Sequence, residues 1–176
     1  MKTQISSRIV KRLAMLVVPC LTMGALTFAA PANNLATKVK GNGIVTMVAT
    51  ANDDVFGVLE EGDSFADNHF QINCKVNADG TANGIAHFFF GEEFSAIWGL
   101  DRMTLRCNID TGAVSEDGTI VLQGLSYEKD FAPGVVWTET TPFVIEVDPA
   151  AGWFTLRWCE LPFLDLEITE GNLTVQ

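Results

Sequence analysis

The chain has 176 residues, 11 basic against 22 acidic side chains, and 48% hydrophobic residues. Its negative charge repels phosphate backbones and anionic lipid headgroups, which argues against nucleic acid and membrane surfaces as partners. A chain of this length suits a single domain with one core.

Residues 1–32 have the features of a secretory signal peptide. Four basic residues and no acid come first, an apolar stretch over 13–28 follows, and a small-residue Ala-Pro-Ala sequence ends at Ala32. The apolar stretch is interrupted by Pro19 and is shorter than the roughly twenty residues of a spanning helix. We therefore expect cleavage after Ala32 rather than an uncleaved anchor. The mature domain, residues 33–176, is then secreted or periplasmic and has no membrane span.

The mature domain keeps 7 basic and 22 acidic residues, a net charge near −15, and three cysteines. An oxidising compartment allows one disulfide and leaves one thiol over. We predict a bridge between Cys107 and Cys159, because each comes at the end of a predicted strand, just before a turn. Cys74 is expected to be free, on an apolar strand face opposite Gly84. A bridge between Cys74 and Cys107, or no bridge, remains open.

Hydrophobic residues alternate with a period of two along most of the mature chain, as in half-buried strands. No stretch of ten or more residues shows a helical stripe. Residues 111–118 are expected to form a long turn, and residues 160–170 a linker that folds back onto the sheet. The predicted strands are 44–49, 70–76, 82–90, 103–109, 120–125, 143–147, 153–159 and 172–175. The predicted fold is all-β, an antiparallel sheet closed or nearly closed into a barrel of about eight strands, with a β-sandwich as the alternative.

The Asp79-Gly80 pair between the second and third of these strands is suited to a tight turn closed by a left-handed glycine. Counted back from this turn, Gln71 faces His87 and His69 faces Phe89. The two histidines then share one face of the hairpin.

His69 and His87 are weak candidates for a metal site, with help from Asp67, Glu92 or Glu93. Two ligands rarely suffice for zinc, so two exposed polar histidines are the preferred interpretation.

The segment 53–67 is rich in carboxylates, which are ligands that calcium prefers. Its spacing matches no calcium loop, so a solvated acidic loop is the preferred interpretation and no cofactor is expected. The weak metal candidates in this segment are Asp53, Asp54, Glu60, Glu61 and Asp63.

Catalytic signatures such as G-x-S-x-G, H-E-x-x-H and G-x-G-x-x-G are absent from the sequence. The adjacent Glu92 and Glu93 would point apart on an extended chain, and Cys74 alternates away from His69. An enzyme is therefore the third of three hypotheses. The first is a binding module for a small apolar molecule or a protein partner. The second is a structural or interaction protein of the cell exterior without a ligand pocket.

The aromatic residues are expected mostly to fill the barrel interior. A cavity between them would favour a small apolar ligand, whereas a filled barrel with an exposed apolar patch would favour an interaction protein. These aromatic residues include Phe65, Phe70, Phe88, Phe90, Trp98, Trp137, Trp153 and Trp158.

The hairpin sequence Phe70-x-Ile-Asn-Cys74-x5-Gly80-x3-Gly84-x3-Phe88 resembles that of a group of small secreted bacterial proteins of unestablished function. The group shares an F-x-F-N-A strand, an A-D-G turn and a closing G-N-x-x-V, which here is Gly171 to Val175. The resemblance implies a compact, exported β-barrel and no catalytic residues.

Overall fold

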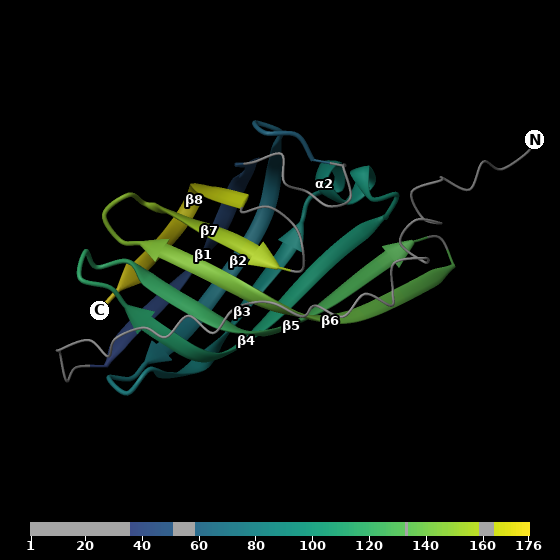
Figure 1. Cartoon of the computed structure of the whole chain (residues 1–176). Helices are drawn as coiled ribbons and strands as arrows, with labels where there is room; N and C mark the ends of the chain where they lie inside the picture. Colours follow the sequence, from purple (N-terminus) through teal and green to yellow (C-terminus); the bar gives the residue numbers. More distant parts are fainter. Residues whose placement is uncertain (1–35, 51–58, 133, 159–163) are drawn as a thin grey trace, which may run out of the picture.

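The chain folds into a closed barrel of eight antiparallel strands (Figure 1). A computed structural model describes residues 36–50, 59–132, 134–158 and 164–176 of the protein. Each strand pairs with the next one along the chain, and β8 closes the barrel by pairing with β1. The predicted antiparallel barrel is therefore confirmed, and the β-sandwich alternative is wrong.

Most strands extend beyond the residues that alternation predicts, because hydrogen-bonded pairing continues past the segments that alternate clearly. The elements are β1 (Thr37–Ala49), β2 (Ser64–Val76), β3 (Thr81–Phe90), α2 (Glu92–Ile97), β4 (Arg102–Val114), β5 (Ile120–Ala132), β6 (Val135–Asp148), β7 (Trp153–Trp158) and β8 (Leu164–Val175).

Large apolar side chains fill the described interior of the barrel. Phe154 packs between two other rings, with centroid distances of 5.0 Å to Phe70 and 6.2 Å to Phe88. Burying a side chain of this kind contributes about 1.5–3 kcal/mol. Of the aromatic residues expected inside, Trp153 is instead 38% exposed, and the side chain of Trp137 lies outside the described part of the structure. The others are buried: Phe65, Phe70, Phe88, Phe90, Trp98 and Trp158.

Helix α2 lies between β3 and β4 and fills one end of the barrel with Phe94. The Phe94 ring is completely buried, and its centroid lies 5.3 Å from that of Phe65, 5.0 Å from Phe90 and 6.2 Å from Trp158. The sequence gives no sign of this helix, since six residues are too few to show a helical stripe. Among the described helices, none has the length and apolar character needed to cross a lipid bilayer.

Two hairpins use the same turn. In the β2–β3 turn the Asp79 carboxylate accepts hydrogen bonds from Thr81 N–H (3.0 Å) and Thr81 Oγ1–H (2.6 Å). Gly80 follows with φ +83°, which an L side chain would rarely adopt. In the β4–β5 turn Asp117 accepts from Thr119 N–H at 2.9 Å and Gly118 has φ +91°. The predicted glycine-closed turn at Asp79-Gly80 is confirmed.

Two predicted connections are wrong. Residues 164–170, expected in a linker, belong to β8 together with the predicted strand 172–175, because their backbone completes the barrel against β1 and β7. The expected long turn over 111–118 is shorter, since β4 continues through Thr111 to Val114 and pairs with β5 after a register shift. The strand was not predicted because Thr111 and Gly112 interrupt the alternation of hydrophobic residues in this segment.

The second half of β5 has an inverted pattern of exposure. Ser126, Glu128 and Asp130 point inward and are no more than 5% exposed. Leu125 and Tyr127, which alternate with them, face outward and are each 48% exposed. Two of these inward residues have hydrogen-bond partners: Ser126 Oγ–H donates to the Thr141 carbonyl at 2.9 Å, and Trp158 Nε1–H donates to Glu128 at 3.0 Å.

Candidate binding site on the outer wall

Apolar side chains gather on the outer wall over β3 and β5. Phe89 is 48% exposed and Ile85 38%, and Leu125 and Tyr127 of β5 face outward with them. These four make up most of the large hydrophobic residues exposed in the described structure; the other two are Val136 and Trp153. The first four lie on the two strands that flank β4, which marks this wall as a candidate interaction surface.

Strand register arranges this surface in three rows that cross β3, β4 and β5. Directly opposed residues of antiparallel strands have Cβ atoms roughly 4.5–5.5 Å apart, so side chains within a row touch or nearly touch. We call these nine residues the outer β3–β5 face. The rows are Ile85–Asn108–Leu125, His87–Arg106–Tyr127 and Phe89–Thr104–Lys129.

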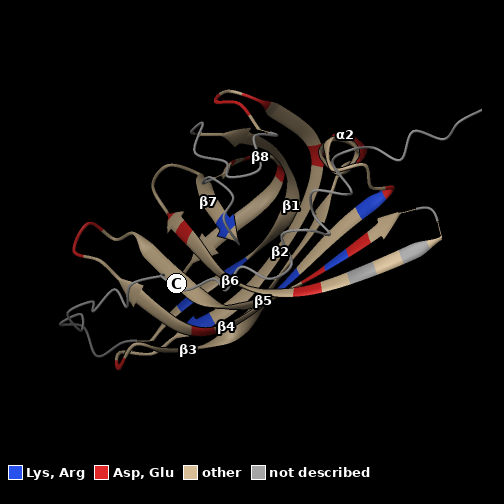
Figure 2. Ribbon diagram, turned by 45° about the vertical axis from the view of Figure 1, so that its right-hand side comes forward, with Lys and Arg blue, Asp and Glu red and all other residues tan. Residues whose placement is uncertain are grey.

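The outer β3–β5 face is positively charged although the chain is acidic. Arg106 lies between His87 and Tyr127, and Lys129 lies at the end of the third row. No Asp or Glu occupies a position in the three rows. Many acidic residues instead lie in end turns such as Glu60–Glu61 and Glu116–Asp117 (Figure 2). The wall therefore combines exposed apolar side chains with two cations that have no acidic residue beside them in the three rows.

Two cation–π contacts lie beside the outer β3–β5 face. The Arg102 guanidinium carbon lies 4.1 Å from the centre of the Phe131 ring, and the Lys129 ammonium lies 5.3 Å from it. Both contacts hold long basic side chains against the outer wall of the barrel. These ring contacts therefore partly fix the positions of the Arg102 and Lys129 side chains near the face.

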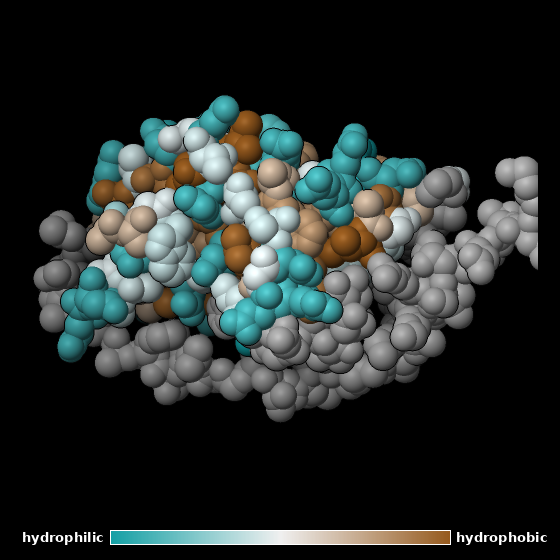
Figure 3. All heavy atoms as spheres, turned by 90° about the horizontal axis from the view of Figure 1, so that it is seen from above, coloured by the Kyte–Doolittle hydropathy of each residue, from teal (hydrophilic) through white to brown (hydrophobic). Residues whose placement is uncertain are grey.

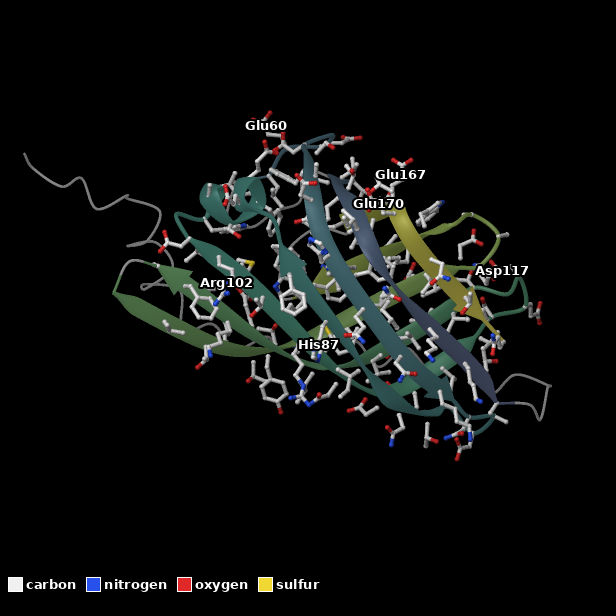
Figure 4. All side chains as sticks on the ribbon, turned by 180° about the vertical axis from the view of Figure 1, so that it is seen from behind. Glu60, His87, Arg102, Asp117, Glu167 and Glu170 are labelled. Carbon is white, nitrogen blue, oxygen red and sulfur yellow. The ribbon has the colours of Figure 1, made fainter. Side chains whose placement is uncertain are left out.

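The predicted hairpin register is confirmed, since Gln71 pairs with His87 and His69 with Phe89. Both histidines therefore share the outer face, and His87 lies on the outer side of the wall (Figure 4). Partial burial, and secondly the nearby Arg106 charge, lower the pKa of His87 below its ordinary value. A guanidinium beside His87 also disfavours a divalent cation there.

The predicted helpers of a histidine metal site do not gather around it. Asp67 lies in β2, whereas Glu92 and Glu93 lie in the first turn of α2 and not on an extended segment as expected. Within the described ranges, no three His, Cys, Asp or Glu side chains are close enough to hold a metal ion.

The acidic candidates before β2 are used in a turn. The Asp63 carboxylate accepts a hydrogen bond from Glu60 N–H at 2.9 Å, and Asp63 N–H donates to the Glu60 carbonyl at 3.0 Å. Glu60 and Glu61 are exposed, and Glu60 projects from the top of the barrel (Figure 4). Asp53 and Asp54 lie outside the described residues.

Seen from above, hydrophobic residues on the described surface are scattered among hydrophilic ones (Figure 3).

The two described cysteines, Cys74 and Cys107, are buried and are not joined to each other. Cys74 faces Gly84 as predicted, and a Cβ on Gly84 would lie 2.5 Å from the Cys74 Cα, so only glycine fits there. Burial raises the pKa of Cys74 to about 11 and that of Cys107 further. Both thiols are thus poor nucleophiles at neutral pH.

The strand argument for the predicted disulfide is partly wrong. Cys107 lies in the middle of β4, because β4 continues to Val114. Cys159 lies outside the described residues, so its pairing with Cys107 stays a prediction.

Sequence reasoning missed most of the outer β3–β5 face. The strand predicted over 120–125 ended where the exposure pattern inverts, so Tyr127 and Lys129 were left unassigned. The signal that could have found them is the continued alternation Leu125, Tyr127, Lys129, Phe131 against Ser126, Glu128, Asp130. No family model, curated protein or solved structure matches this chain.

Proposed function

We propose that the mature domain, residues 33–176, is an exported binding module that recognises a protein partner through the outer β3–β5 face. The observation that carries this proposal is the inverted half of β5. There Leu125 and Tyr127 are exposed while Glu128 and Asp130 are buried. A soluble domain gains stability from the opposite arrangement, so the exposed apolar side chains point to a binding role.

The chemistry of the face defines the partner. Tyrosine and arginine are the side chains that most often dominate the energy of protein interfaces. Tyr127 and Arg106 are directly opposed near the centre of the face, with Phe89 and Leu125 around them. Arg106 and Lys129 complement negative charge. The partner is therefore a protein surface that presents acidic side chains beside aromatic or aliphatic ones.

A small apolar ligand inside the barrel is the hypothesis that the packing favours less. Phe88, Phe143 and Phe154 are at most 2% exposed and occupy the described interior. At the β5–β6 side, the inner wall carries Ser126 and Glu128, which would be poor neighbours for an apolar molecule. The exposed apolar residues of the outer β3–β5 face fit an interaction protein better than a barrel with an internal ligand pocket.

Photo-crosslinking in the protein's own host tests the proposal. The exported chain carries a benzophenone amino acid in place of Tyr127. Irradiation should give one discrete adduct with a different protein, and Arg106→Glu in the same chain should reduce the adduct at least tenfold. An interface centre of this kind is worth about 2 kcal/mol or more per side chain.

The matched control carries the same amino acid in place of Glu167, an exposed residue of β8 on another part of the wall (Figure 4). This control should give no such adduct. Equal adducts from both positions, or none from position 127, would contradict the proposal. An adduct of twice the chain mass would show self-association instead and would also overturn it.

A further inference from the structure

Three of the seven basic residues of the mature chain line one groove on the outer wall. The groove has a volume of about 510 Å³ and lies over the first three strands and the end of β8. No Asp or Glu side chain is among the described residues that line it. It is lined by Lys38, Lys40, Lys75, Asn73, Asn83 and Gln176, among others.

We propose that this groove binds a small multivalent oxyanion of the phosphate or sulfate type. The proposal rests on three lysines that do not belong to the outer β3–β5 face, although Ile85 is common to the groove and the face.

Strand register brings the lysines together. Lys38 of β1 is directly opposite Lys75 of β2, and Lys75 is opposite Asn83 of β3. In the next row, Lys40 is opposite Asn73. Direct neighbours have Cβ atoms roughly 5 Å apart and diagonal neighbours roughly 7–8 Å apart, so all three ammonium groups can reach one ligand.

Such a cluster is costly without a counter-charge. Like charges directly opposite each other on neighbouring strands destabilise a sheet. Lys38 and Lys75 form such a pair in a chain that carries three times as many acids as bases after residue 32. An α-carboxylate at Gln176 would offset one of the three positive charges and leave two. An anion in the groove would relieve the remaining repulsion.

The lysine side chains are compatible with such an anion. A lysine ammonium group is a compact point charge with three donors, and it binds phosphate without the fixed two-point geometry by which arginine matches a carboxylate or a phosphate. Asn73 and Asn83 add amide N–H donors on the same wall. Several point charges with neutral donors between them suit an oxyanion with charges spread over many oxygens. The same chemistry belongs to a free polyphosphate and to the sulfate groups of a glycan.

Calorimetric titration of the mature domain with inorganic tripolyphosphate tests the inference at low ionic strength. We expect one tripolyphosphate per barrel, with affinity that falls as NaCl is added because salt screens exposed charges. Lys75→Gln should weaken binding about tenfold, a typical loss for one charge-assisted contact. The control Arg102→Gln removes the same charge at the other end of the barrel wall and should leave the affinity within about twofold.

A sulfated tetrasaccharide titrated in parallel identifies the source of the oxyanion. Binding of either probe that Lys75→Gln weakens would support the anion site in the groove. The probe that binds more tightly would indicate whether the oxyanion comes from a polyphosphate or from a sulfated glycan. Absence of binding to both at 1 mM would overturn the inference. Equal weakening by Lys75→Gln and Arg102→Gln would also overturn it, because binding would then follow net charge alone.

Thermal unfolding gives a second readout that needs no ligand affinity. Lys75→Glu replaces a repulsive pair with an attractive one, so the melting temperature without anion should rise by roughly 1–3 °C. Tripolyphosphate should raise the melting temperature of the unsubstituted domain and not that of Lys75→Glu. A lower melting temperature for Lys75→Glu without anion would contradict the repulsion on which the inference rests.

Discussion

Replacing Phe94 with alanine removes the side chain with which helix α2 fills one end of the barrel. The ring is completely buried, and its centroid lies within 6.5 Å of four other aromatic rings. A buried Phe→Ala change costs about 3–5 kcal/mol, because it removes apolar contacts and leaves a cavity. A domain of this size has a total stability of only about 5–15 kcal/mol. We therefore expect the melting temperature to fall by roughly 10–15 °C.

Phe89→Ala is the matched control, because Phe89 is the same residue type in the adjoining strand and is 48% exposed. Its loss should cost no more than about 1 kcal/mol. Urea unfolding at pH 7, followed by tryptophan fluorescence, gives both free energies of unfolding. If Phe94→Ala loses no more stability than Phe89→Ala, helix α2 does not support the barrel and the packing argument is wrong.

Three further predictions concern export, the cysteines and pH. N-terminal sequencing of exported protein should begin at Asn33, and material that still begins at residue 1 would contradict the signal-peptide prediction. Non-reducing peptide mapping should find Cys107 joined to Cys159; a cross-linked peptide that contains the third mature cysteine would refute this. The lowered pKa of His87 means that the unfolded chain binds more protons below about pH 6.5, so the free energy of unfolding falls as the pH drops through that window. His87→Gln should remove this part of the pH dependence in urea titrations between pH 5 and 7.5, and an unchanged pH profile would count against it.

The β2–β3 hairpin shows how much of the fold the sequence predicts. Asp79 and Gly80 specify a turn of known geometry, and the turn fixes the register of every pair behind it. That register correctly placed His69 and His87 on one face and Cys74 against Gly84. Local chemistry was sufficient here, because a short turn joins the two strands.

The candidate site was harder to predict because the alternation in the second half of β5 continues with apolar and polar residues on exchanged faces. In β5, Tyr127 and Leu125 break the rule that apolar residues face the core, so a strand prediction based on that rule stops early. The lysine groove lies over β1, β2, β3 and the end of β8, and backbone hydrogen bonds join Lys38 to Gln176, more than 130 residues further along the chain. A pattern among neighbouring residues of the sequence cannot predict a contact between segments so far apart.

The pairing of the first strand with the last has a kinetic consequence. β1 and β8 are opposed from Val39 and Val175 to Ala49 and Leu164, so the final seam joins residues more than a hundred positions apart. Contacts of such long sequence separation form slowly, because the entropy of closing the loop is lost before the contact is gained. Until β8 arrives, one side of β1 presents unpaired N–H and C=O groups, which can pair with another chain. The barrel can therefore close only when the twelve residues of β8 pair. A chain without β8 would expose the edges of β1 and β7, and these are the strands at which it would aggregate.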